Sequence, residues 1–160
     1  MKKCSCGEYS DIELIRKAIN ERIKKSKDLK KQLKLVSKSD TENILFVCEI
    51  CNQFWQSSRA WNWGNDEYLF KVPIIELQDW IQNQFMAPDE MLIYSAGMSV
   101  YMESNINSFV DGNEKCIKDD CIEKSLKGGK LCKNHFIENL GVVGLIPKRP
   151  KGRLFKPYQD

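Results

Sequence analysis

The chain has 160 residues, of which 42% are hydrophobic and 29% charged, with a formal net charge of +3. This composition is typical of one folded globular domain and excludes a collagen-like or disordered chain. No apolar run approaches the ~18 residues of a membrane span, and no apolar segment typical of a secretory signal follows Met1, so we expect a cytoplasmic protein outside the membrane.

A long helix is predicted in the first forty residues. Ser10 and Glu13 have the spacing of a capping box, in which two side chains close the first turn of a helix. The isoleucines from Ile12 to Ile23 recur every three or four residues, as on one face of a helix. Val36 continues this pattern, so we predict a helix from residue 10 to about residue 36, straight or bent near Ser26.

Two strands of a small antiparallel sheet are predicted next, at 43–48 and 67–72, where β-branched and aromatic residues gather. A polar loop is predicted between them, over 56–66. Pro73 ends the second strand, and a short amphipathic helix is predicted over 75–85.

Residues 87–90 have the pattern of a helix N-terminus, with a proline at the first helical position and two acids in the first turn. The helix that they begin has one face marked by large side chains, namely Met91, Tyr94, Met98, Tyr101 and Met102. Residues 141–147 are apolar and strand-like. The basic residues that follow are interrupted by Pro150 and Gly152, so we expect a mobile tail.

Four candidate metal ligands lie close together in the last third of the chain: Cys116, Cys121, Cys132 and His135, the only histidine. Zinc is held by sulfur and nitrogen donors that come in close pairs on tight turns, and these residues form two such pairs. The glycines at 128 and 129 predict a turn that brings the second pair back to the first. We predict a Cys3His zinc site here rather than buried cysteines and a surface histidine.

The other four cysteines are predicted to form a second site. Cys48 and Cys51 have the spacing of a zinc knuckle, whereas Cys4 and Cys6 are closer together than usual. The alternatives are a redox-active Cys-x-x-Cys, which is typical of a thioredoxin-like βαβ context, and a site with fewer protein ligands. A disulfide framework is not expected, because the chain has seven cysteines and no export signal. Two structural zinc ions are therefore the predicted cofactors.

Residues 116–136 resemble the small Cys-Cys-Cys-His zinc module of phage and bacterial proteins, which some HNH-type homing endonucleases carry beside their nuclease core. The resemblance covers about twenty residues and implies a zinc site but no nuclease, because the nuclease motif needs several histidines. The pair Cys48 and Cys51, followed by Phe54 and Trp55, also resembles the first knuckle of small uncharacterised bacterial zinc proteins. Some proteins of that type are immunity proteins or inhibitors of toxins.

Both predicted zinc sites are closed by four protein ligands, whereas a catalytic zinc keeps a position for water. The sequence has no glutamate beside a histidine ligand, as zinc hydrolases and deaminases require, and no glycine-rich phosphate loop. A serine-histidine-aspartate triad would need His135, which the metal site already uses. We therefore expect a non-catalytic protein in which zinc stabilises the fold.

Binding to another protein, in the manner of an immunity protein, inhibitor or adaptor, is the predicted function. Residues 41–110 carry a formal charge of −7, which favours fast encounter with a basic partner. Tryptophan and tyrosine are enriched at binding hot spots, although the same tryptophans can be core residues. The predicted contact residues are Arg59, Trp61, Trp63, Asp66, Glu67 and Tyr68.

Nucleic-acid binding is the alternative function, because residues 1–40 carry +6 and residues 111–160 carry +4. A solvated helix face and a tail explain the same charges. Zinc-bound thiolates would also remove the net positive charge, which makes this function less favoured. The candidate residues are Lys24, Lys25, Lys27, Lys30, Lys31 and Lys34 in the helix and Lys148, Arg149, Lys151 and Arg153 in the tail.

Together these patterns predict an α+β fold: a small antiparallel sheet with about three helices, held by two structural zinc knuckles. The predicted domains are an α/β core over 1–110 with the N-terminal zinc site, a Cys3His zinc lobe over 111–140 packed on it, and a strand-like segment with a basic tail over 141–160. The sequence does not predict the oligomeric state.

Overall fold

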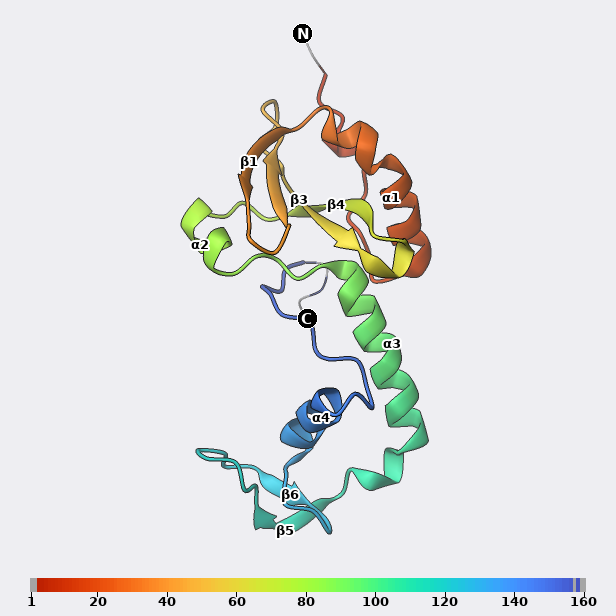
Figure 1. Ribbon diagram of the computed structural model, residues 1–160, viewed down its shortest axis with the longest axis vertical. Coiled ribbons are helices and arrows are strands. Elements are labelled where there is room, and N and C mark those ends of the chain that lie inside the picture. Colours follow the sequence, from red (N-terminus) through yellow and green to blue (C-terminus); the bar gives the residue numbers. More distant parts are fainter. Residues whose placement is uncertain (1–2, 157, 159–160) are drawn as a thin grey trace. The chain divides into compact units, whose positions relative to one another are not determined.

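The computed structural model describes residues 3–156 and residue 158, and it divides the chain into two compact units (Figure 1). Unit 1 is built from Met1–Leu92 and Pro150–Asp160, and unit 2 from Ile93–Arg149. Helix α3 (Pro88–Ser104) begins in unit 1 and continues into unit 2. Unit 2 is therefore inserted between two segments of unit 1.

A four-stranded antiparallel sheet forms the centre of unit 1, with the strands in sequence order. Its strands are β1 (Lys34–Lys38), β2 (Ile44–Val47), β3 (Phe54–Ala60) and β4 (Asp66–Val72). Unit 2 contains a second, two-stranded antiparallel sheet of β5 (Asp111–Lys115) and β6 (Lys124–Leu126). With helices in both units, the predicted α+β class is confirmed.

Both faces of the sheet in unit 1 are covered by hydrophobic clusters. Adjacent residues of a strand point to opposite faces, so neighbours in β4 belong to different clusters. In β4, Tyr68 and Phe70 belong to a larger hydrophobic cluster that also contains Ile19 and Trp80. Leu69, between them in sequence, belongs to a second cluster that comprises Cys6, Leu29, Phe46, Cys48, Trp55 and Leu69. Two candidate metal ligands thus lie within this second cluster.

Helix α1 (Arg16–Lys30) packs against β4 and differs from the predicted helix at both ends. The predicted capping box at Ser10 is wrong, because the N-cap residue is Ile15 and makes no side-chain hydrogen bond. The predicted continuation to residue 36 is also wrong, because residues 34–38 form β1. Pairing of β1 with β2 outweighs the local helical pattern there.

Helix α2 (Leu77–Gln82) is fixed to the sheet by Gln56, a completely buried residue of β3. The Gln56 Oε1 atom accepts hydrogen bonds from the Trp80 indole at 2.9 Å and from the Phe85 amide at 3.0 Å. The Gln56 Nε2 group donates to the Phe85 carbonyl at 2.8 Å. The polar loop predicted over 56–66 is therefore wrong for its first half, which is strand β3.

The C-terminal segment of unit 1, residues 150–156 with residue 158, is held by hydrogen bonds and ring contacts, whereas a mobile tail was predicted. The Arg153 amide donates to the Gln84 carbonyl at 2.8 Å, and the Met86 amide donates to the Arg153 carbonyl at 3.0 Å. Phe155 is buried against Phe70 and Phe85. Gly152 has a φ of 132°, and a Cβ atom there would lie 2.8 Å from the Met86 nitrogen, so a glycine is required.

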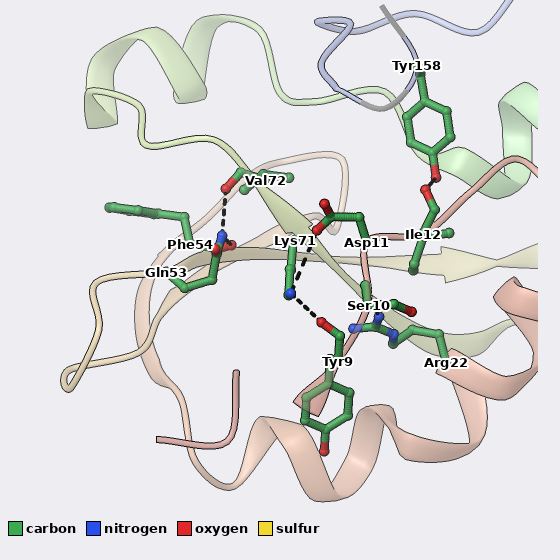
Figure 2. A network of polar contacts seen from close by, with 10 residues as sticks. All are labelled: Tyr9, Ser10, Asp11, Ile12, Arg22, Gln53, Phe54, Lys71, Val72 and Tyr158. Atoms are coloured by element: carbon green, nitrogen blue, oxygen red, sulfur yellow. Dashed lines mark hydrogen bonds and ion pairs between the residues drawn. The ribbon is translucent and has the colours of Figure 1, made fainter. Parts of the chain in front are cut away.

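Residues 9–12, which we term the N-terminal strap, connect the first cysteine pair to α1 (Figure 2). Side chains from three different elements hold the strap by its backbone. The carbonyl groups of Tyr9, Ser10 and Ile12 accept hydrogen bonds from Lys71, Arg22 and Tyr158, respectively. Lys71 also forms an ion pair with Asp11 at 3.7 Å. The strap is thereby tied to α1, β4 and the C-terminal segment.

Unit 2 contains most of α3, the β5–β6 hairpin and α4 (Lys133–Val142). Phe109 has edge-on ring contacts with both Tyr101 of α3 and Phe136 of α4. The strand predicted over 141–147 is not observed, since α4 reaches Val142 and residues 143–147 contain no strand. Among the described residues, no helix has the length and apolar character to cross a membrane.

Candidate metal centres

The first candidate metal centre consists of Cys4, Cys6, Cys48 and Cys51, whose sulfur atoms all lie within 4.8 Å of one another. The Cys4 sulfur is 3.2 Å from that of Cys51 and 3.8 Å from that of Cys48. Cys4 and Cys6 lie at a short 3₁₀ turn (Cys6–Glu8), and the other two lie in the turn between β2 and β3. The structure thus brings together the two cysteine pairs predicted to share one site.

Backbone amides point at the sulfur atoms of this centre. The Cys6 amide lies 3.3 Å from the Cys4 sulfur. Although burial raises the pKa of Cys48, hydrogen bonds from the Cys51 and Ile50 amides lower it to about 7. The turn that contains these amides ends at Asn52, where φ is 58°. The Asn52 amide donates a hydrogen bond to the Cys48 carbonyl at 2.8 Å. These donors stabilise the thiolate form that metals bind.

Cys6 has the opposite environment, because it is buried in the second hydrophobic cluster. Burial raises the pKa of Cys6 to about 12, and the Trp55 side chain opposes this rise only in part. A metal ion displaces the proton of such a thiol, so binding here is coupled to proton release.

The second candidate metal centre lies in unit 2 and consists of Cys116, Cys121, Cys132 and His135. The His135 Nδ1 atom is 3.3 Å from the Cys116 sulfur and 3.2 Å from the Cys132 sulfur, while the Cys121 and Cys132 sulfurs are 3.8 Å apart. Cys116 follows β5, Cys121 precedes β6, and Cys132 is the N-cap residue of α4. A hairpin and a helix end therefore supply the two pairs.

Amides also point at the sulfur of Cys116. Burial raises the pKa of Cys116, but hydrogen bonds from the Cys132 and Lys118 amides and from His135 lower it to about 6. Asp120, which precedes Cys121, has a φ of 59°, and Gly128 in the turn between the pairs has a φ of 77°. The chain reverses twice at these positions, which lets ligands distant in sequence converge.

Both donor sets fit a tetrahedral metal ion. Bond lengths of about 2.3 Å to sulfur and 2.0 Å to nitrogen place tetrahedral sulfurs about 3.8 Å apart, and sulfur and nitrogen about 3.5 Å apart. Five of the separations within the two centres, at 3.2–3.8 Å, are close to these values, and all the others are within 4.8 Å. All seven cysteines are free thiols, so none is used in a disulfide.

The predicted protein-contact residues lie in different environments at the β3–β4 hairpin. Trp61 is 59% exposed in the 3₁₀ turn Trp61–Trp63, whereas Tyr68 is completely buried and cannot contact a partner in this fold. The Glu67 carboxylate accepts hydrogen bonds from Lys30 at 2.7 Å and Ser57 at 2.9 Å. These bonds within the chain give Glu67 a structural role. Arg59 and Asp66 are exposed, and Trp63 is half-buried.

The predicted nucleic-acid residues are divided between the two units. Lys24, Lys25 and Lys27 are exposed on α1, and the described residues give them no ion pair. Three further α1-side lysines are paired: Lys30 with Glu67, Lys31 with Asp28 and Lys34 with Glu49. Of the tail residues, Lys148 and Arg149 belong to unit 2, and Lys151 and Arg153 to unit 1.

No family model, curated protein or solved structure matches this chain. The two centres are therefore described by their own geometry.

The amide donors were not predicted from the sequence. Five cysteines have the amide of the residue two positions later directed at their sulfur; these amides belong to Cys6, Ile50, Gln53, Lys118 and Glu123. A cysteine on a tight turn, followed at the second position by any residue except proline, is the sequence signal for such a donor.

Proposed function

We propose that this chain is a non-catalytic protein with two structural zinc ions that binds another protein through the tip of its β3–β4 hairpin. The exposed Trp61 on a rigid turn is the observation that carries the binding function. The two closed ligand sets carry the zinc assignment.

Zinc suits both centres because cysteine thiolate and imidazole are its usual structural ligands, with four protein atoms around the ion. The first centre joins residues 4–6 with residues 48–51, which are far apart in the chain, and the second joins residues 116–121 with residues 132–135. A structural zinc ion supplies on the order of 10 kcal/mol of folding free energy, comparable with the whole stability of a domain. When bound, the ion would hold these segments together.

Metal content and local unfolding test the zinc assignment. The purified chain is expected to contain two zinc ions, and Cys48→Ser and Cys132→Ser are each expected to contain one. By hydrogen exchange, Cys48→Ser should loosen the β2–β3 turn of unit 1, and Cys132→Ser should loosen α4 of unit 2. Each variant is the control for the other. Two zinc ions in both variants, or another metal in the wild type, would contradict the assignment.

The tip of the hairpin is a preorganised surface. The turn is held between paired strands, and the Asn65 amide donates to the Ala60 carbonyl at 3.1 Å. The guanidinium of Arg16 lies 4.8 Å from the centre of the Trp63 ring, which fixes that ring beneath it. Trp61, in the same turn, presents a large exposed apolar surface of the kind found at binding hot spots.

Loss of one ring tests the binding function. Capture of a protein from a lysate by the immobilised zinc-loaded chain is expected to fall at least tenfold in Trp61→Ala, since hot-spot residues contribute about 2 kcal/mol or more. Leu35→Ala is the matched control, because Leu35 is also more than half exposed but lies on β1. Equal capture by both variants would contradict the proposed surface.

Nucleic-acid binding is the second candidate, favoured by the unpaired, exposed Lys24, Lys25 and Lys27 on α1. It predicts an affinity for single- or double-stranded nucleic acid that falls steeply with salt and is lost in the triple glutamine variant. An affinity that is lost in Trp61→Ala but independent of these lysines favours the first function instead.

A further inference from the structure

Asp89 is a completely buried carboxyl group in the first turn of α3. Neither of its oxygens has a hydrogen-bond partner among the described residues. Acidic residues in a first helical turn are ordinarily at the surface, where they interact with the helix dipole and water. Its neighbour Glu90 is exposed in this way. An ionised carboxylate without partners in a protein interior is costly, so the position favours the neutral acid.

No positive charge among the described residues compensates Asp89. Tyr68 of β4 interacts with it electrostatically, and the Tyr68 hydroxyl is likewise completely buried and without a partner among the described residues. Tyr68 also interacts electrostatically with Tyr158 of the C-terminal segment and with Arg22 of α1. Glu90 is the charged neighbour on α3 itself, and it repels an ionised Asp89.

Arg22, the cation of this neighbourhood, is engaged elsewhere. Its guanidinium donates to the Ser10 carbonyl in the N-terminal strap. It also lies 5.1 Å from the centre of the Tyr9 ring and 5.2 Å from that of Trp55. It is therefore a structural link between α1 and the strap and not a counter-ion for Asp89.

We propose that Asp89 is a proton-operated latch: its neutral carboxyl group docks the first turn of α3 on unit 1, and loss of the proton loosens that turn. The position gives the latch its effect, since α3 passes from unit 1 into unit 2 between Leu92 and Ile93, one turn after Asp89. Proton loss would thus act at the start of the helical connection between the units.

The electrostatic environment places the transition near neutral pH. Burial, with the repulsion from Glu90, raises the pKa of Asp89 to about 7, although the amides of Asp89 and Glu90 oppose the rise. In the unfolded chain the ordinary pKa is about 3.9. Between these two values the folded protein holds a proton that the unfolded chain has lost, so stability falls as the pH rises. Above the folded pKa both states are ionised and the loss is complete.

The zinc-loaded full chain and its Asp89→Asn variant test the latch, because asparagine has the shape of the neutral acid and cannot titrate. Relative to the variant, the unfolding constant of the wild type is expected to rise about thirtyfold between pH 5.5 and 8.5. Amides of residues 90–95 should lose hydrogen-exchange protection over the same range in the wild type and keep it in Asp89→Asn. Glu103→Gln, which removes an exposed acid at the other end of the same helix, is the matched control and should keep the wild-type pattern.

The carbon-13 resonance of the Asp89 carboxyl group gives a direct measurement that requires no variant. We expect its titration midpoint near pH 7 in the wild type, with zinc content checked in each sample. A midpoint below pH 5, or a pH dependence of exchange that is the same in wild type and Asp89→Asn, would overturn the proposal.

Discussion

Gln56 shows how a single polar side chain can determine the position of a helix. It is completely buried, and its amide group makes three hydrogen bonds, to the Trp80 indole and to both backbone groups of Phe85. All three partners depend on Gln56, because a buried donor or acceptor without a partner is costly. The docking of α2 on the sheet therefore rests on this residue.

Replacing Gln56 by leucine keeps the volume and removes the hydrogen bonds. We expect Gln56→Leu to lower the free energy of unfolding of unit 1 by at least about 3 kcal/mol, since three buried groups lose their partner. Urea unfolding measures the change. Gln82→Leu, at an exposed position of α2, is the control and should change stability by less than about 0.5 kcal/mol. An equal effect of the two substitutions would show that Gln56 has no such role.

The residues of the metal centres could be predicted from the sequence, whereas their supporting residues could not. Cysteine and histidine spacing identifies all eight ligands, because zinc geometry restricts ligands to close pairs. The amides that stabilise Cys48 are backbone groups, which no residue type reveals. For Asp89, the sequence predicts the helix start but not which of the two acids points inward.

At the scale of elements, prediction succeeded where the local pattern and the tertiary contacts agree. Strands β2 and β4 and helix α3 lie within a residue or two of the predicted ranges. Strand β3 was missed because Gln56, Ser57 and Ser58 are polar yet buried, so no alternation of apolar residues marks it. Gln56 and Ser57 have partners from elsewhere in the chain, such as Glu67 for Ser57, whereas the buried Ser58 hydroxyl has none among the described residues.

The free edge of the sheet shows how a short strand is protected. Within the part of the chain that the structure describes, strand β1 pairs only with β2, and an irregularity between Leu35 and Ser37 interrupts the register. Lysines occupy both ends of this strand, at positions 34 and 38. Charged ends and a bulge oppose the pairing of an edge strand with another chain. The two lysines of β1 therefore have a structural role, which is to oppose pairing of this edge strand with another chain.

At the scale of the whole molecule, unit 1 is built from a segment that precedes unit 2 in the sequence and a segment that follows it. Phe155 is buried against Phe70 and Phe85, and Tyr158 donates a hydrogen bond to the Ile12 carbonyl. These contacts join the C-terminal segment to the N-terminal strap. The sequence did not predict them, because Pro150 and Gly152 are typical of loops and long-range packing leaves no local pattern.

Removal of the Phe155 ring tests this dependence. We expect Phe155→Ala to destabilise unit 1 by about 3–5 kcal/mol, the usual range for a buried phenylalanine. Hydrogen exchange should show lost protection in β3 and β4 and unchanged protection in α4. Leu145→Ala, at an exposed position of unit 2, is the control. Loss of protection in α4 as large as in β4 would contradict the division into two units.

The insertion of unit 2 within unit 1 has a consequence for biosynthesis. Residues 93–149 emerge from the ribosome before Phe155 and Tyr158, which unit 1 needs to complete its core. Unit 2 can therefore bring its four candidate metal ligands together while the sheet of unit 1 still lacks Phe155, although most of that sheet was translated earlier. Nascent chains halted shortly after residue 149 would expose the apolar surface that Phe155 later covers. A chaperone that recognises apolar surface would bind the chain at this stage.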